Sequence, residues 1–286
     1  MALVVCRNRR ATTLSALDRL RRQTVSADVY IAVFDDASDD GTPEAIAQSY
    51  PDVKIIHGDG NAFWNGGLHQ LWSTVHKTPV DAFLWLNDDT ILDNDALFRL
   101  TEAWKEMQAN TGNERFILVG ATRGTRGEVS YGGFDVVPSP FAFRLVSAPP
   151  HDTALRLVKT FNGNIVLVSH DVVKSVGLND PGFFHNLGDI DYGLRAQQAG
   201  IPIALLPGTL GLCAPNETKT KYGYGSPHLS VFEQWRKVSS HHGLPPRSWW
   251  RFTRRHSGSR WLLHFLLPYR HLVSVWRLRS RANRNI

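Results

Sequence analysis

The sequence is poor in cysteine and lacks long apolar runs, and both shortages restrict what the protein can be. Cys6 and Cys213 are its only cysteines among 286 residues, which excludes a disulfide-rich scaffold and predicts two free thiols in a reducing compartment. No apolar run approaches the roughly 20 residues that a membrane-spanning helix needs. The apolar segment Ala2–Cys6 directly follows Met1, with no pattern of a secretory signal before it. We therefore expect a cytoplasmic globular protein.

Acidic residues are missing from the end of the chain. No Asp or Glu follows Glu233, whereas residues 234–286 carry 12 Lys and Arg. The formal net charge of +6 therefore belongs to this tail. Residues 247–286 combine ten Arg with four Trp, a composition typical of short helices on an anionic membrane surface. A tail helix packed on the body is an alternative. We expect no nucleic-acid partner, because no recognition motif accompanies the basic residues.

Two common phosphate-binding loops are also absent. Neither G-x-x-x-x-G-K-[ST] nor G-x-G-x-x-G occurs in the sequence, which excludes the P-loop and the dinucleotide fingerprint. A bound pyrophosphate would then need a cation or a helix N-terminus to offset its charge.

The first half of the chain alternates apolar runs with helical patterns. Strands are predicted over Ala2–Cys6, Val29–Phe34, Val53–Ile56 and Ala82–Leu86, and helices over Ala11–Arg22, from Thr42, over Leu68–His76 and over Asp95–Gln108. This alternation predicts an α/β fold with a mostly parallel sheet, whose ligands bind beyond the carboxyl ends of the strands. Residues 120–169 are rich in Gly, Pro and β-formers and predict antiparallel strands and loops. A later helix is expected over Asp189–Gln198.

Acidic residues gather where these strands end. Asp35 and Asp36 end the second strand, Asn87–Asp89 end the fourth, and Asp189 and Asp191 open the later helix. Carboxylates at this edge suit a hard divalent cation such as Mg²⁺. Each group alone is compatible with a solvated turn or a helix cap, but three groups in this order favour a site.

The ordered groups resemble glycosyltransferase family 2. The resemblance covers about residues 2–215 and rests on Arg7-Asn8-Arg9, Asp35-Asp36-Ala37-Ser38-Asp39-Asp40-Gly41-Thr42, Asn87-Asp88-Asp89 and Gly188-Asp189-Ile190-Asp191-Tyr192 with Arg195-Ala196. The segment His57-Gly58-Asp59-Gly60-Asn61 with Phe63-Trp64-Asn65-Gly66-Gly67 resembles a rhamnosyltransferase-like subset that builds surface polysaccharides such as O-antigen or capsule. The resemblance implies the GT-A fold over residues 1–230, followed by a basic, Trp-rich helical extension over residues 231–286.

The resemblance also implies roles for individual residues. The donor site is expected to comprise Arg7, Asn8, Arg9, Asp36, Asn61, Gly66, Gly67, Asn87 and Asp88. Asp36 would contact the nucleobase, Asp89 would bind Mg²⁺ or Mn²⁺, and Asp189 would be the catalytic base. Asp191 would support the helix start or an acceptor hydroxyl. Trp64, Asn162 and Asn164 are candidates for the acceptor or sugar pocket, although residues 160–164 also fit a tight turn. Trp85 alternates within a strand and is expected in the core.

The implied activity is inverting, metal-dependent transfer of a sugar. The donor would be dTDP-rhamnose or a UDP-sugar, and the acceptor a hydroxyl of a lipid-linked bacterial glycan at the inner face of the cytoplasmic membrane. A sugar nucleotidyltransferase is an alternative, but it needs a G-x-G-T-R-like loop where this chain has Arg7-Asn8-Arg9-Arg10. A non-catalytic glycan-binding module would tolerate loss of Asp89 and Asp189, and both are present. The patterns predict neither the linkage nor the oligomeric state.

One position departs from the pattern. Many relatives place a metal-binding His about six residues after the Pro of the next strand, and that count from Pro207 reaches Cys213. Cysteine prefers softer metals than Mg²⁺, so we expect Cys213 to be a packing residue. His185 and His228 are further candidates for the metal.

Overall fold

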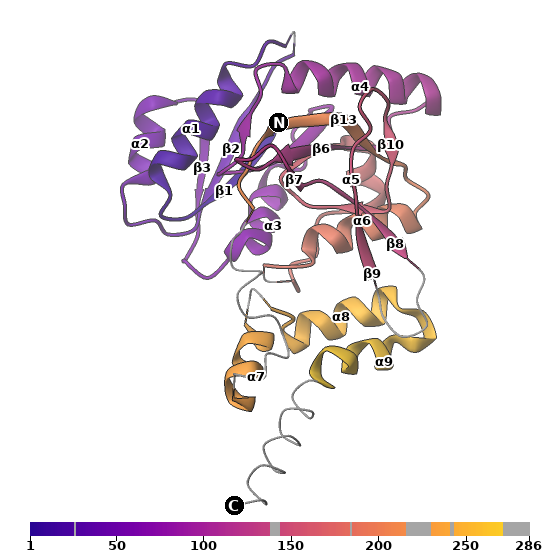
Figure 1. Ribbon diagram of the computed structural model, residues 1–286. Coiled ribbons are helices and arrows are strands. Elements are labelled where there is room, and N and C mark those ends of the chain that lie inside the picture. The colour runs from indigo at the N-terminus through magenta and orange to yellow at the C-terminus, as the bar shows by residue number, and fades with distance from the viewer. Residues whose placement is uncertain (26, 138–143, 184, 216–229, 241–242, 271–286) are drawn as a thin grey trace, which may run out of the picture.

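The sheet at the centre of the molecule is wide and mixed. The computed structural model describes the chain except residues 26, 138–143, 184, 216–229, 241–242 and 271–286. Within the described part, ten strands form one sheet along the order β10-β13-β6-β12-β4-β1-β2-β3, with β5 paired to β13 and β7 to β6. Helices flank the sheet (Figure 1). The predicted α/β class is confirmed.

Residues 1–87 build the parallel half of the sheet. Its elements are β1 (Ala2–Cys6), α1 (Arg10–Arg21), β2 (Ile31–Asp35), α2 (Thr42–Ser49), β3 (Lys54–His57), α3 (Phe63–Val75) and β4 (Ala82–Asn87). The strands β4-β1-β2-β3 are all parallel. Helix α3 begins at Phe63, before the predicted start at Leu68. Gly66 and Gly67 lowered the helical signal there, and tertiary packing overrides their low propensity.

The second half adds strands of both directions. Its elements are β5 (Ile91–Leu92), α4 (Ala96–Thr111), β6 (Ile117–Arg123), β7 (Val129–Tyr131), β8 (Gly133–Val137), β9 (Arg144–Ala148), β10 (Arg156–Leu157), β11 (Thr160–Phe161), β12 (Ile165–Ser169), α5 (His170–Val176), α6 (Gly188–Gln198) and β13 (Ile203–Leu212). Strand β12 is antiparallel to both of its neighbours, β4 and β6. Its first residues therefore lie at the edge where β1, β2 and β4 end. A separate sheet has the order β11-β8-β9.

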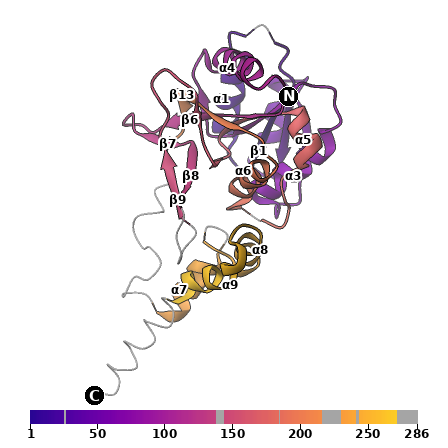
Figure 2. The ribbon, with the colours of Figure 1, turned by 90° about the vertical axis from the view of Figure 1, so that its right-hand side faces the viewer.

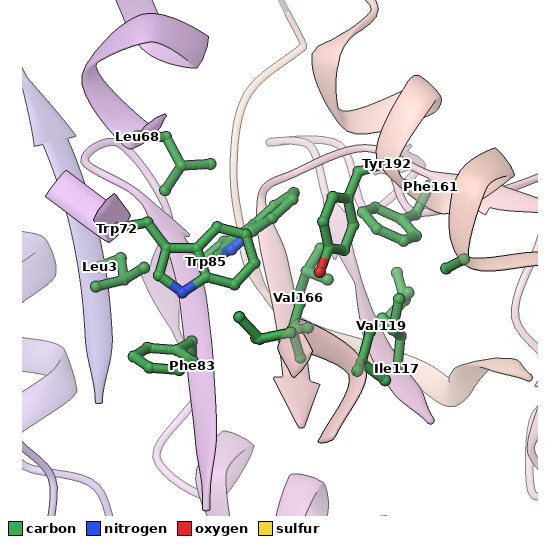
Figure 3. Close-up of a cluster of buried hydrophobic side chains, with 14 of the residues drawn as sticks. Leu3, Leu68, Trp72, Phe83, Trp85, Ile117, Val119, Phe161, Val166 and Tyr192 are labelled. Atoms are coloured by element: carbon green, nitrogen blue, oxygen red, sulfur yellow. The ribbon is translucent and has the colours of Figure 1, made fainter. Parts of the chain in front are cut away.

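Aromatic side chains fill the core between the sheet and the helices α3 and α6. The Trp85 ring lies 5.2 Å from the Trp72 ring and 5.1 Å from the Tyr192 ring, and Figure 3 shows the three rings among aliphatic side chains of the sheet. Trp85 is only 1% exposed, which confirms its predicted place in the core. Because Trp72 and Tyr192 come from α3 and α6, this cluster fixes both helices against β4.

The C-terminal segment forms short helices beside the α/β domain. They are α7 (Val231–Ser239), α8 (Pro246–His256) and α9 (Trp261–Leu266), with 3₁₀ turns η2 (Gly258–Arg260) and η3 (Leu267–Tyr269). Both ribbon views place α7, α8 and α9 together on one side of the domain (Figures 1 and 2). Trp249 and Phe252 of α8 pack against Phe183 and against Ile190 and Leu194 of α6. Helix α8 is thus packed on the body, one of the two roles considered for the tail. Across the described residues, no helix has the length and apolar character needed to span a bilayer.

Candidate active site

Four chain segments meet at one edge of the sheet. Strands β1, β2 and β4 end there, at Cys6, Asp35 and Asn87, and the antiparallel strand β12 begins there. The backbone N–H of Asn87 donates to the carbonyl of Asn164 at 3.1 Å, across the seam between β4 and the segment before β12. The topology therefore brings the predicted donor groups after β1, β2 and β4 to the same edge as the predicted pocket residues Asn162 and Asn164.

Arg9 joins the turn after β1 to the acids after β4. Its guanidinium donates to Asp88 Oδ1 at 2.8 Å and to Asp89 Oδ2 at 2.9 Å. Asp88 is 5% exposed, and burial raises its pKa to about 7 although Arg9 opposes the shift. The Asp89 side chain remains 26% exposed. An oxygen of Asp88 and the amide oxygen of Asn87 are buried without a hydrogen-bond partner, so this corner retains unused oxygen acceptors.

Asp36 shapes the loop that leads into α3. Its buried carboxylate accepts backbone N–H groups from Gly60 at 2.9 Å, Ala62 at 3.1 Å and Phe63 at 3.1 Å. Arg7 lies 4.0 Å from the same carboxylate and donates to the carbonyl of Gly60. Asp36 therefore organises this loop with both of its oxygens, and its predicted contact with a nucleobase remains a prediction.

The backbone around this edge is strained. Four non-glycine residues in the described chain have positive φ: Asn8 (50°), Ala37 (55°), Phe63 (53°) and Leu187 (73°). They follow β1, follow β2, open α3 and precede α6. A side chain in the left-handed region costs about 1–3 kcal/mol, and such residues cluster at functional sites. The strained residues therefore lie close in sequence to the predicted site residues that follow β1 and β2 and to those of α3 and α6.

Asp189 stands in the first turn of α6, with its carboxylate fixed by backbone groups. Oδ1 accepts the N–H of Ile190 at 2.8 Å and Oδ2 accepts the N–H of Gly163 at 3.0 Å, and the Asn162 side chain also hydrogen-bonds to it. Burial raises the pKa of Asp189 despite these donors. The residue is partly exposed. It is thus a held carboxylate with increased basicity, the property that a general base needs.

Gly163 brings the predicted pocket residues together. A Cβ on Gly163 would come within 2.3 Å of the Trp64 ring, so only glycine lets the chain pass under this indole. The Trp64 ring also lies 6.2 Å from the Trp85 ring in an edge-to-face arrangement. Residues 162–164 therefore connect Trp64 on α3, Asp189 on α6 and Asn87 on β4. The two interpretations of residues 160–164, a tight turn and a pocket, are compatible, because the residues of this turn make the contacts with Trp64, Asp189 and Asn87.

Asp191 faces a different environment from Asp189. It is fully buried and accepts from Arg195 at 2.9 Å, from Arg255 at 2.7 Å and from His256 at 2.9 Å. Burial opposes its ionisation, but the hydrogen bond from His256 and the charges of Arg195 and Arg255 outweigh it and hold the pKa of Asp191 below its ordinary value. Asp191 therefore supports the helix and joins it to α8, in line with the first of its two expected roles.

The remaining donor candidates differ in exposure. Asn61 is exposed in the loop that Asp36 holds. Gly67 is buried, and a Cβ there would lie 2.8 Å from Val5 and 2.9 Å from Phe34, so its small size serves the packing of α3 on the sheet. Gly66 has only an ordinary contact with Ala62 at 3.8 Å. Of the two glycines, Gly66 is the one with space for a ligand beside its backbone.

Comparison with known proteins agrees with this geometry. Residues 2–131 match the family model described as Glycosyl transferase family 2. This match covers less than half of the chain, so residues 2–131 are similar to that family. The chain is also 26% identical over 193 residues to an N-acetylglucosaminyl-diphospho-decaprenol L-rhamnosyltransferase of Mycobacterium tuberculosis, a match over 60% of this chain and 62% of the relative. The match thus spans less than two thirds of that relative. The predicted resemblance to glycosyltransferase family 2 and to its rhamnosyltransferase-like members is confirmed.

Solved structures extend the likeness to the whole fold. A mannosyltransferase, PcManGT from Pyrobaculum calidifontis in complex with GDP-Man and Mn²⁺, has a TM-score of 0.55 at 14% identity and covers 98% of this chain and 74% of its own. GalNAc-T7 with UDP, GalNAc and Mn²⁺ has a TM-score of 0.56 at 13% identity and covers 94% of this chain and 53% of its own. The predicted GT-A fold is confirmed. Strand β12 and helix α6 of this fold lie outside residues 2–131.

The edge of the sheet near Asp89 offers few side-chain ligands for a metal ion. Cys213 Sγ lies 3.5 Å from Asp89 Oδ1 and accepts from the Asn164 amide at 3.4 Å. Burial and the charge of Asp89 raise the pKa of Cys213 to about 12, so the thiol is neutral near pH 7. Among the residues that the structure describes, His, Cys, Asp and Glu form no cluster of three suited to a metal. The partly exposed carboxylate of Asp89 is the group here that could hold a Mg²⁺ or Mn²⁺ ion, because such an ion needs only one or two carboxylates when phosphate oxygens and water supply the rest.

The two histidine candidates receive no support as metal ligands. His185 lies in the segment before α6, and no group of metal-binding residues within the described ranges includes it. His228 lies outside the described residues. Both assignments remain untested.

Several residues that organise the α/β domain were not predicted. Asn65 is fully buried, donates to the carbonyls of Asp180 and Phe183, and receives the amide of Asn179. A Cβ on Gly188 would lie 1.9 Å from the Asn65 amide oxygen. Helix α3 thereby holds the segment before α6. The sequence signal for this contact was weak, since it consists of single polar residues separated by more than a hundred positions.

Proposed function

We propose that the protein is an inverting, metal-dependent glycosyltransferase that transfers a sugar from a nucleotide-diphosphate donor to a hydroxyl of a lipid-linked bacterial glycan. The observation that carries the proposal is Asp189, a partly exposed carboxylate with a raised pKa. It is held by the N–H of Gly163, whose neighbour Asn164 bonds to Asn87 at the end of β4. A non-catalytic glycan-binding module would not need a carboxylate fixed in this way.

We assign the donor to the edge formed by the turns after β1, β2 and β4. Arg7, Asn8 and Arg9 and the loop held by Asp36 would form the nucleotide pocket, and Asn87 and Asp88 would face the ribose. The unpaired oxygens of Asn87 and Asp88 support this assignment. Asn61 and Gly66 would border the donor from the start of α3. A nucleotidyltransferase is disfavoured, because Asn8 and Arg9 stand where its glycine loop would be.

Asp89 would hold the divalent ion, with Asp88 as its nearest carboxylate neighbour. When bound, Mg²⁺ or Mn²⁺ would neutralise charge on the leaving diphosphate. Arg9 now pairs with both acids, so its guanidinium lies where it can also meet a diphosphate oxygen. Mn²⁺ accompanies two of the GT-A structures that resemble this chain, which supports the choice of ion.

The chemistry follows from the position of Asp189. Its carboxylate removes the proton of the acceptor hydroxyl while that oxygen forms a bond to the anomeric carbon. The bond between the anomeric carbon and the diphosphate breaks, and its electron pair leaves with the diphosphate. One displacement from the opposite face inverts the anomeric centre. Trp64, Asn162 and Asn164 would line the sugar or acceptor pocket. Asn162 and Asn164 flank Gly163, which bonds to Asp189, and the Trp64 ring lies against Gly163.

The expected donor is dTDP-rhamnose or a UDP-sugar. The likeness to a decaprenol-linked rhamnosyltransferase supports rhamnose and a lipid-linked acceptor. The test is a panel of nucleotide sugars incubated with the full chain, Mn²⁺ and a polyprenyl diphosphate-linked N-acetylglucosamine, with product detected by mass spectrometry. Transfer from dTDP-rhamnose with inversion supports the proposal. Absence of transfer from every donor, with nucleotide binding intact, contradicts it.

We also propose that the C-terminal extension rests on an anionic membrane surface, which would place the enzyme at the inner face of the cytoplasmic membrane. Its helices expose large apolar side chains: Phe232 (71%), Trp235 (44%), Trp250 (39%), Leu262 (49%), Leu263 (43%) and Leu266 (53%). No acid follows Glu233 to repel anionic lipid. Each basic residue near such a surface contributes about 1 kcal/mol.

Vesicle sedimentation tests this surface. Replacing Leu262, Leu263 and Leu266 with Ser should lower binding to phosphatidylglycerol vesicles at least roughly tenfold, because these three exposed side chains together are worth several kcal/mol of burial. The control replaces Phe98 and Leu157, which are 51% and 67% exposed on the α/β domain, and should bind as the parent does. Equal binding of both variants would refute the surface.

A further inference from the structure

Helix α8 contacts helix α6 through a partly buried cluster of charges. Arg255 bridges two acids from different segments, with Nη1 2.7 Å from Asp191 and Nη2 2.8 Å from Asp180. Arg251 adds a second pair of contacts to Asp180, both at 2.9 Å. His256 Nε2 donates to Asp191 Oδ1, 2.9 Å away. Three residues of α8 thus contact both the segment that enters α6 and the first turn of α6.

This cluster is tied to the position of Asp189. Asp191 lies two residues after Asp189 in the same helical turn. Asp180 belongs to the segment that Asn65 of α3 also holds, through the Asp180 carbonyl at 2.9 Å. The entry to α6 is therefore fixed from α3 on one side and from α8 on the other. Leu187, at the turn into α6, has φ of 73°, a strained conformation that persists only where its surroundings enforce it.

We infer that Arg255 is a positioning residue for the base: by bridging Asp180 and Asp191 it sets where α6 starts and hence where the Asp189 carboxylate stands. This inference rests on the proposed function. It makes α8 part of the catalytic machinery, in addition to any role of the extension at a membrane. A displacement of about 1 Å at a reacting group is enough to lower a rate by roughly 100-fold, so a side chain that fixes a helix start can control turnover.

The variant Arg255→Gln should fold, because the other supports of α8 remain. Asp191 keeps its contacts with Arg195 and His256, and Asp180 keeps Arg251. Trp249 also continues to pack against the body. Arg254, the residue before Arg255, provides a matched control.

Arg254 carries the same charge as Arg255 but points elsewhere. Its guanidinium lies over the Trp250 ring at 5.9 Å and over the Trp261 ring at 5.5 Å, away from α6. Arg254→Gln therefore removes the same charge from the same helix without touching Asp180 or Asp191. A difference between the two variants reports the bridge and not the charge.

The experiment compares Arg255→Gln, Arg255→Lys and Arg254→Gln in the full chain by two readouts. Hydrogen exchange measures protection of the first turn of α6, and steady-state kinetics with the best donor of the panel measures turnover and the KM for that donor. We expect Arg255→Gln to lose protection in this turn and to lose roughly 10–100-fold in turnover, with an unchanged KM for the donor. Arg255→Lys should be intermediate, because one ammonium makes only one of the two contacts. Arg254→Gln should match the parent in both readouts.

Three outcomes would overturn the inference. One is an Arg255→Gln variant that matches Arg254→Gln in both readouts. Another is a loss of turnover without a change in exchange, which would mean that Arg255 acts by another route. The third is a loss of protection with full turnover, which would make the bridge structural only. If the unmodified chain transfers no sugar from any donor, the proposed function fails by itself, and the exchange comparison alone then decides whether Arg255 holds α6.

Discussion

Replacing Asp189 by Asn is the sharpest test of the site. The substitution keeps the size of the side chain and removes its ability to take a proton. General-base catalysis is worth roughly 10²–10⁴-fold in rate, which corresponds to about 3–5 kcal/mol of barrier. We therefore expect turnover to fall by that factor, while the dissociation constants of UDP and dTDP stay the same because the donor edge is not altered.

The structure predicts little change in stability for this variant. Both oxygens of Asp189 now accept backbone N–H groups, from Ile190 and Gly163. In the Asn variant, the side-chain oxygen still accepts one of these two N–H groups, but the side-chain NH₂ group faces the other. That backbone N–H therefore loses its hydrogen bond to a charged group, which is worth about 1.5–3 kcal/mol. Removal of the buried charge, the cause of the raised pKa, acts in the opposite direction. We expect the free energy of unfolding to change by less than about 2 kcal/mol.

The assay combines turnover, nucleotide affinity and the pH profile of the parent and the variant. In the parent, turnover should fall as pH decreases and Asp189 becomes protonated, at a pH above that of an ordinary carboxyl because its pKa is raised. The variant should lack this acidic limb. Asp191→Asn changes the neighbouring acid, and it should lose stability because Arg255 and Arg195 then face a neutral partner. Turnover near the parent level in Asp189→Asn would refute the assignment of the base.

Further predictions concern the metal, the core of the site and its response to acid. EDTA should abolish transfer and Mg²⁺ or Mn²⁺ should restore it, and full activity after exhaustive dialysis against EDTA would contradict the metal role. Cys213→Ser should leave the Mn²⁺ concentration for half activity unchanged and cost about 1 kcal/mol by thermal unfolding, since the thiol is a neutral packing group; a large rise in that concentration would show it to be a ligand. Gly163→Ala should lower turnover at least roughly tenfold, because the Trp64 ring must move, and a wild-type rate would refute that contact. The pKa values of Asp180 and Asp191 are lowered in the folded protein. The ionised carboxylates therefore stabilise the fold fully above about pH 4, and this contribution is lost as the pH falls below that value. An acid unfolding profile that is unchanged in Asp191→Asn would contradict this prediction.

Most of the α/β half was predictable because its signals are local. Runs such as Ala2–Cys6 and Ala82–Asn87 are apolar and short, and polar groups follow them directly. In a parallel sheet this pattern alone places Arg9 and Asp89 at one edge. The start of α3 was misplaced, because Gly66 and Gly67 weaken the local signal and only the sheet beneath Gly67 explains why a helix forms.

The rest of the site could not be predicted from local patterns. The pairing of Arg255 with Asp180 and Asp191 joins residues 64 to 75 positions apart, and the tail composition indicated only a basic, aromatic segment. The distinct environments of Asp189 and Asp191 likewise depend on what packs beside α6. Residue type and spacing indicated both acids, whereas tertiary contacts distinguish the partly exposed carboxylate of Asp189 from the buried, ion-paired carboxylate of Asp191.

The position of β12 in the sheet has a consequence for how the chain folds during synthesis. Residues 1–87 can form the parallel unit β4-β1-β2-β3 as soon as they emerge, but β4 then has a bare edge. Its partner appears only with β12, where Ile165 pairs with Leu86. Until then the apolar strand Ala82–Asn87 is an open template for pairing with another chain. Ribosome-bound intermediates that stop before residue 165 should therefore depend on chaperones, and the segments of the candidate site can meet only after β12 is inserted beside β4.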